Sequence, residues 1–127
     1  MAWSSLSAIG IGAVLGAWMR WGLGTLLNPV FPTLPLGTLA ANLLGGFVIG
    51  VMMGSTDTLG LSPTMRLLIT TGFLGALTTF STFSAEAVAL LARAQYGWAS
   101  ALVVLHLSGS LLLTGAGIVL VRALIGR

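Results

Sequence analysis

Five hydroxyl groups crowd into seven consecutive residues of this chain, in the segment TTFSTFS at positions 78–84. The segment holds, in order, Thr78, Thr79, Phe80, Ser81, Thr82, Phe83 and Ser84. Hydroxyls donate and accept hydrogen bonds, and the edge of a phenyl ring is electropositive. One Ser or Thr in an apolar helix commonly bonds only to the carbonyl of the preceding turn. A cluster this dense exceeds that need and favours a site that handles an ion.

Other polar residues recur at helical spacing elsewhere in the apolar sequence. Thr38 and Asn42 are four residues apart and share one helix face. His106, Ser110 and Thr114 form a second stripe at the same spacing. A single histidine or asparagine is also typical of an ordinary bond between membrane helices. Phe80 and Phe83, taken singly, are equally typical of packing residues.

The residue types favour a small anion over a cation or a catalytic centre. The Asn42 amide, the hydroxyls and Arg20 are hydrogen-bond donors, whereas the carboxylates that line cation paths are nearly absent. Glu86 is the only acid within an apolar span. The sequence has no cysteine and one histidine, so it offers no thiolate metal site and no recognisable catalytic group. We do not expect an enzyme.

Composition identifies the environment of these polar groups. Of the 127 residues, 57% are hydrophobic and 6% are charged, and the mean hydropathy is +1.09. Soluble domains carry roughly 25% charged residues. Residues 21–56, 67–85 and 94–121 contain no charged side chain, and about 20 apolar residues suffice to cross a bilayer. The sequence therefore predicts an all-α integral membrane protein.

Turn-forming segments divide the chain into four helices. NPVFPTLP (28–35), STDTLGLSP (55–63) and AQYGWAS (94–100) contain the helix breakers and interfacial aromatic residues. The predicted spans are about 3–27, 35–54, 64–93 and 98–122, within a single transmembrane domain over residues 1–127. No Lys or Arg precedes Arg20, so we expect the first span to be retained rather than cleaved as a signal peptide. Both termini should lie on one side of the membrane.

Glycines predict close helix packing and one interruption. Gly12 and Gly16, and Gly46, Gly50 and Gly54, recur every four residues, as in tightly packed membrane helices. Residues 75–79 (GALTT) join a flexible glycine to two β-branched threonines, which predicts a break in the third span. A break leaves backbone groups that protein, water or an ion must satisfy. Broken helices of transporters coordinate ions in this way.

The charges give little preference for one orientation in the membrane. Arg66, Arg122 and Arg127 fall on one predicted side, and Arg20 and Arg93 fall on the other. Orientation follows the Lys/Arg excess of short loops, so this chain could insert both ways, although three against two could also suffice to orient it. Four short helices do not easily enclose an aqueous path. Two antiparallel copies would create the inverted repeat that transport proteins use.

Three segments resemble a known family of membrane proteins. GAVLGAWMRWGLG (12–24), PLGTLAANLLGG (35–46) and GFLGALTTFSTFSAE (72–86) resemble the signature segments of the Fluc (CrcB-like) fluoride channels. The resemblance implies a dual-topology homodimer of the bacterial inner membrane, with two antiparallel pores that export fluoride and a central structural Na⁺. Departures are small: Ala13, Ala76, Trp21 and His106 replace residues that are usual in the family.

The resemblance also implies roles for individual residues. Phe80 and Phe83 match the phenylalanines that line the fluoride paths, and Asn42 matches the pore asparagine. Gly75 and Thr78 match the positions whose backbone carbonyls hold Na⁺. Arg20 matches an arginine at the vestibule of a pore, and Ser81 and Thr82 belong to the third signature segment. Glu86, Ser110 and Thr114 correspond to a polar track that leads from the phenylalanines.

Two alternatives come from other functional classes. Small multidrug-resistance transporters are also short four-span antiparallel dimers, but their proton-coupled efflux requires a carboxylate in the first helix, where this chain has no acid. A membrane assembly subunit that transports nothing would gain little from the hydroxyl cluster at 78–84.

Overall fold

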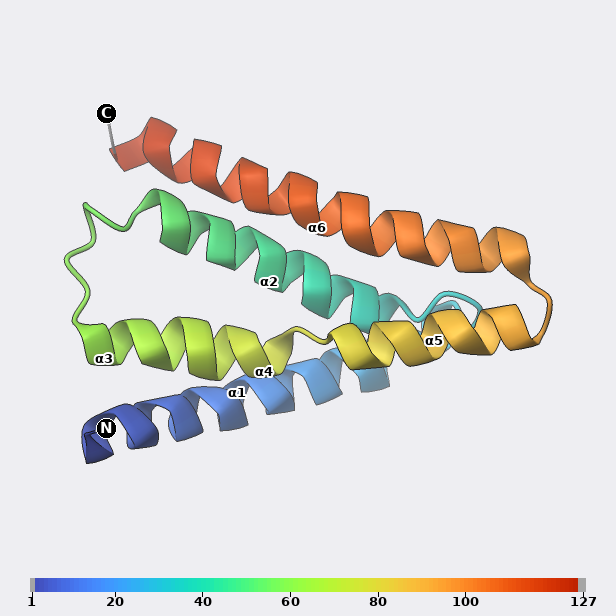
Figure 1. The fold of residues 1–127 in the computed structure, drawn as a ribbon, viewed down its shortest axis with the longest axis horizontal. Coiled ribbons are helices and arrows are strands. Elements are labelled where there is room, and N and C mark those ends of the chain that lie inside the picture. Colours follow the sequence, from blue (N-terminus) through green and yellow to red (C-terminus); the bar gives the residue numbers. More distant parts are fainter. Residues whose placement is uncertain (1, 126–127) are drawn as a thin grey trace.

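Helices make up nearly all of the computed structural model, which describes residues 2–125 (Figure 1). The first two spans are formed by α1 (Trp3–Leu27) with the short helix η1 (Asn28–Val30), and by α2 (Leu36–Gly54). The last span is α6 (Tyr96–Ile125). The third consists of four consecutive pieces: α3 (Pro63–Arg66), η2 (Leu67–Leu74), α4 (Gly75–Leu77) and α5 (Phe80–Ala92).

The structure confirms the predicted all-helical class with four spans. Helical segments over Trp3–Val30, Leu36–Gly54, Pro63–Ala92 and Tyr96–Ile125 are long and apolar enough to cross a bilayer, and residues 2–125 contain no strand. The chain is a multi-pass membrane protein. The start of α1 and the end of α6 lie at the same end of the bundle (Figure 1). Arg127, used above in the charge balance, lies outside the described residues.

Glycines bring the helices together in two pairs, as their spacing predicted. Gly12 and Gly16 of α1 lie so close to the backbone of η2 that an added Cβ would overlap the Leu68 and Phe73 carbonyl oxygens. On the other side of the bundle, Gly46, Gly50 and Gly54 of α2 face the backbone of α6 around Ser110, Thr114 and Ile118. Side chains of any size at these positions would separate the helices.

Polar side chains fix the connections between spans. The Asn28 Oδ1 accepts hydrogen bonds from the backbone N–H groups of Gly37 and Thr38, at 2.7 and 3.3 Å. It therefore satisfies donors of the first turn of α2, which no side chain of the preceding residue caps. At the other end of the bundle, the Arg66 guanidinium donates to the Thr56 and Leu61 carbonyls and closes the loop between α2 and α3.

The third span changes its backbone conformation twice. Residues Leu67–Leu74 are π-helical, and α4 ends at Leu77. Thr78 and Thr79 then have extended backbones, with ψ angles of 154° and 116°, before α5 begins at Phe80. Figure 1 shows this stretch as a thin connection between α4 and α5. The Thr79 Oγ1 caps α5 by accepting from the Thr82 N–H at 3.1 Å.

Candidate functional site

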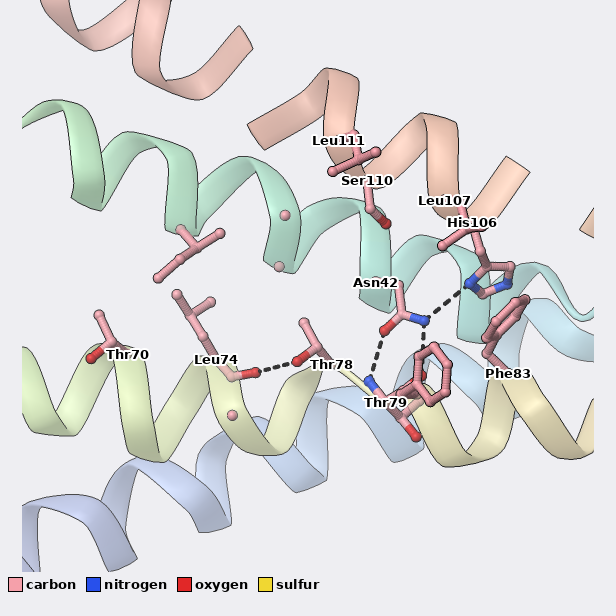
Figure 2. Close-up of a pocket in the computed structure, with 15 residues that line it drawn as sticks. Asn42, Thr70, Leu74, Thr78, Thr79, Phe83, His106, Leu107, Ser110 and Leu111 are labelled. Carbon is pink, nitrogen blue, oxygen red and sulfur yellow. Dashed lines mark hydrogen bonds between the residues drawn. The ribbon is translucent and has the colours of Figure 1, made fainter. Parts of the chain in front are cut away.

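Asn42 connects the extended stretch to the two neighbouring helices. Its Oδ1 accepts from the Thr79 backbone N–H at 2.7 Å, and its Nδ2 donates to the Thr79 carbonyl at 3.0 Å. The same Nδ2 lies 3.0 Å from the His106 Nδ1 of α6. Figure 2 shows these three contacts converging on one amide. The amide thus replaces helical hydrogen bonds that the third span lacks at this point.

Two carbonyls lose their helical donors at this point in the third span. In a continuous helix the Thr79 and Thr82 N–H groups would donate to the carbonyls four residues earlier, which belong to Gly75 and Thr78. Here the Thr79 N–H donates to Asn42, and the Thr82 N–H donates to the Thr79 hydroxyl. The Gly75 and Thr78 carbonyls are therefore free to accept from, or coordinate, another partner.

Three aromatic rings lie in series beside the amide. Phe80 and Phe83 meet edge to face with centroids 5.6 Å apart, and the Phe83 ring lies 4.6 Å from the His106 ring. Phe83 is buried, and it belongs to an apolar cluster that also contains Leu90 and Leu102. Phe80 is 74% exposed on the surface of the single chain. The Phe83 ring is thus held in place by the fold, whereas the Phe80 ring faces outward.

Two cavities meet at Thr79. The first has a volume of about 480 Å³, and its polar lining comes from α2, η2, α6 and the extended residues between α4 and α5. These polar residues are Asn42, Thr70, Thr78, Thr79, His106 and Ser110, and Gly75, Phe80 and Phe83 also line the cavity. The second, of about 510 Å³, is lined by Arg20 together with Asn28, Thr25, Thr38, Thr79 and Thr82. The structure therefore places most of the predicted site residues in the lining of these two cavities, which share Thr79.

Three predicted site residues line neither cavity. The Glu86 Oε1 accepts from the Thr38 hydroxyl at 2.6 Å, and its Oε2 is buried with no partner among the described residues. The Thr114 hydroxyl donates to the Gly46 and Ser110 carbonyls and so links α2 to α6. Ser81 is exposed, with its Oγ 3.4 Å from the Thr79 Oγ1. Thr38 connects Glu86 to the second cavity, which it lines.

Comparison with known protein families shows to which family the chain belongs. The family described as CrcB-like protein, Camphor Resistance (CrcB), matches residues 7–118. The chain belongs to the CrcB-like family.

Relatives of this CrcB-like chain align over nearly its whole length. It is 59% identical to a protein of Cupriavidus taiwanensis over 112 residues, covering 87% of this chain and 89% of the relative. It is 57% identical to a protein of Nitrosospira multiformis, covering 93% of each, and 53% identical to one of Pseudomonas putida, covering 97% and 98%. All three relatives are named fluoride-specific ion channel FluC.

Two contributions to the site of this CrcB-like chain were not predicted. Thr79 was predicted as a hydroxyl of the cluster and as part of the break over residues 75–79, but the separate bonds of its N–H, carbonyl and hydroxyl were not predicted. His106 was predicted as part of a polar stripe or as an ordinary bond between helices, but its particular contacts with Asn42 and Phe83 were not predicted. A threonine directly before the first residue of a helix is a typical N-cap, and this is the pattern that would have indicated the capping role of Thr79.

Proposed function

We propose that this chain is a fluoride-selective ion channel that lets fluoride leave the cytoplasm across the bacterial inner membrane. The observation that carries the proposal is the name shared by relatives that are 53–59% identical along most of the chain. The site supports it independently, because the polar lining of the two cavities consists of hydroxyls, the Asn28 and Asn42 amides, an imidazole, the Trp21 indole and Arg20, with no carboxylate. Such a lining suits an anion better than a cation, and it suits conduction rather than catalysis.

The two cavities suggest the course of the path. Arg20 would attract an anion into the second cavity, where the Thr82 hydroxyl can replace part of its water shell. Thr79 borders both cavities, so it marks the passage to the first, where the ring edges and Ser110 continue the path. The passage beside Phe83 lies in the packed interior, which favours a small anion over chloride.

Fluoride efflux from liposomes tests this function directly. Purified protein is reconstituted with potassium fluoride inside, and valinomycin is added so that potassium can balance the exported charge. We expect rapid efflux that depends on both protein and valinomycin, together with chloride efflux close to that of protein-free liposomes. Equal rates for the two anions, or efflux that is independent of valinomycin, would contradict a fluoride-selective channel.

The active assembly, in our proposal, is an antiparallel homodimer. One chain leaves Phe80 and Gly75 exposed although both line the first cavity. A second copy packed over this face would close the cavity and bury the exposed ring. The near balance of Arg66, Arg122 and Arg127 against Arg20 and Arg93 on the two predicted sides permits insertion in both orientations.

Reporter fusions should reveal both orientations in one cell population. A reporter that is active only in the cytoplasm and one that is active only in the periplasm, each fused to the C-terminus, should both give signal. Adding three lysines to the C-terminus should shift the population to one orientation and lower fluoride efflux. Signal from one reporter alone in the unmodified chain would exclude the antiparallel pair.

A structural Na⁺ at the dimer interface is the second part of the proposed assembly. Residues 2–125 contain no group of three His, Cys, Asp or Glu side chains that could hold a metal, and the resemblance to the fluoride-channel family implies backbone oxygens as ligands instead. The Gly75 and Thr78 carbonyls fit, because both lack their helical donors and both residues line the first cavity. Two copies would supply four carbonyl oxygens, the ligand type that hard cations prefer. Bound there, Na⁺ would join the two chains.

Replacing sodium by a large organic cation should weaken the dimer and abolish efflux. Because the proposed ligands are backbone oxygens, Thr78→Ala should retain sodium dependence: the Thr78 hydroxyl donates only to the Leu74 carbonyl of its own helix, at 2.9 Å. Dimer content by crosslinking and efflux rates, both measured against sodium concentration, check the expectation. Full assembly and full efflux without sodium would exclude a structural role for the ion.

The transporter alternative finds no support in the first span. A proton-coupled exchanger of the small multidrug-resistance type needs a carboxylate there, and α1 (Trp3–Leu27) contains none. Glu86, the acid of the third span, is bonded to Thr38 and lines neither cavity.

A further inference from the structure

The orientation of the Asn42 amide is determined by the backbone of Thr79. Amide oxygen and nitrogen are assigned from the hydrogen-bond network. A backbone N–H can only donate, so the atom 2.7 Å from the Thr79 nitrogen must be the Asn42 oxygen. The Nδ2 then points at the Thr79 carbonyl, which can only accept, at 3.0 Å. The reverse orientation would place the Nδ2 donor against the Thr79 N–H, which is also a donor. It would also place the Oδ1 acceptor against the Thr79 carbonyl, which is also an acceptor.

This orientation determines the protonation state of His106. The second Nδ2 hydrogen of Asn42 points at the His106 Nδ1, 3.0 Å away, so that ring nitrogen must accept. A proton on Nδ1 would place two donors against each other. The neutral ring therefore carries its proton on Nε2, which is buried with no partner among the described residues. His106 is 3% exposed, so water does not compensate for a misplaced proton.

The orientation of the Asn42 amide depends on the acceptor that the His106 Nδ1 supplies. Its remaining hydrogen bonds both go to the backbone of Thr79, whose N–H donates to Asn42 and not to the carbonyl four residues earlier. The α2 helix supplies the Asn42 backbone, and α6 supplies the acceptor, so the amide is held from two sides (Figure 2). Without the acceptor, one amide hydrogen loses its partner and the amide is no longer held from the side of α6.

We propose that His106 is a positioning residue of the ion path, in which a neutral imidazole with an unprotonated Nδ1 holds the Asn42 amide against the extended backbone at Thr79. His106 acts through Asn42: it keeps the amide in the one orientation that fixes Thr79, and Thr79 borders both cavities. The inference rests on the proposed function where conduction is the readout, and it rests on geometry alone where the protonation of the ring is the readout.

Two amide variants separate the acceptor from the mere presence of a polar group. In His106→Asn the amide oxygen takes approximately the place of Nδ1, whereas in His106→Gln the polar atoms lie one bond further out, near the place of Nε2. We expect His106→Asn to conduct fluoride within about threefold of the wild type, and His106→Gln to lose about tenfold, which corresponds to roughly 1.4 kcal/mol. Equal rates in the two variants, at equal dimer content, would overturn the proposal.

A double-mutant cycle tests whether His106 acts through Asn42. In the Asn42→Ala background, His106→Gln should cause no further loss, because the group that it positions has been removed. Efflux is measured for the wild type, both single variants and the double variant. If the two losses multiply, His106 acts independently of Asn42 and the positioning role is wrong.

The single histidine makes a spectroscopic test possible without conduction. Protein labelled with ¹⁵N at histidine alone gives one imidazole, whose two nitrogens distinguish the tautomers in an NMR spectrum. We expect an unprotonated Nδ1 and a protonated Nε2 in the wild type, and a mixture of tautomers in Asn42→Ala. A protonated Nδ1 in the wild type would overturn the proposal. This result stands even if the wild type conducts no fluoride, which would refute the proposed function alone.

Discussion

Replacing Phe83 with isoleucine is expected to lower fluoride efflux by about a hundredfold, equivalent to roughly 2.7 kcal/mol in the barrier. Isoleucine retains an apolar side chain in the cluster that contains Leu90 and Leu102, but it removes the electropositive ring edge. Phe83 is the buried member of the aromatic series and contacts both Phe80 and His106. An anion that has shed water beside it has few other donors to replace that water.

Phe80→Ile should impair efflux as well, for a related reason. Phe80 lines the first cavity and meets the Phe83 ring edge to face at 5.6 Å. Its exposure on the single chain means that its replacement leaves the packing within the chain intact. Efflux is measured at equal dimer content, and Ser100→Ala serves as a control because the Ser100 hydroxyl is exposed and bonded only to Tyr96. Wild-type rates in both phenylalanine variants would mean that the rings only pack.

The sequence was sufficient to predict the spans, because lipid imposes strong rules on the chain. Apolar stretches must be long enough to cross, and their backbone bonds must close within each helix. The predicted limits 35–54 and 64–93 differ by one residue at each changed end from Leu36–Gly54 and Pro63–Ala92. The spacing of Gly12 and Gly16 likewise predicted a close helix contact, since only small residues allow it.

The contacts within the site were beyond sequence reasoning, because they depend on which helices are neighbours. Asn42, Thr79 and His106 are separated by 37 and 27 residues along the chain, and no local pattern pairs them. The π-helical stretch Leu67–Leu74 was also not predicted, since its hydrophobic sequence is compatible with an ordinary helix. From the sequence we predicted that the Asn42 amide hydrogens would donate to the anion. In the structure these hydrogens donate to the Thr79 carbonyl and to the His106 Nδ1 of the same chain.

That difference makes Asn42 the most informative position for a second substitution series. Asn42→Ala removes the acceptor of the Thr79 N–H and the donor to the Thr79 carbonyl and to His106. Each buried polar group left without a partner costs about 1–3 kcal/mol, so we expect a less stable dimer as well as a loss of efflux of about a hundredfold. Thermal unfolding in detergent and efflux from liposomes measure the two effects separately.

Asn42→Asp separates the structural role of this side chain from its role as a donor. The carboxylate has almost the shape of the amide and still accepts from the Thr79 N–H, so the dimer should be more stable than that of Asn42→Ala. Its second oxygen, however, faces the Thr79 carbonyl, and its negative charge lies beside the path of an anion. We therefore expect efflux as low as in Asn42→Ala despite the recovered stability. If Asn42→Asp conducted like the wild type, Asn42 would serve only to hold the interruption at Thr79, and the donors of the path would have to come from the hydroxyls alone.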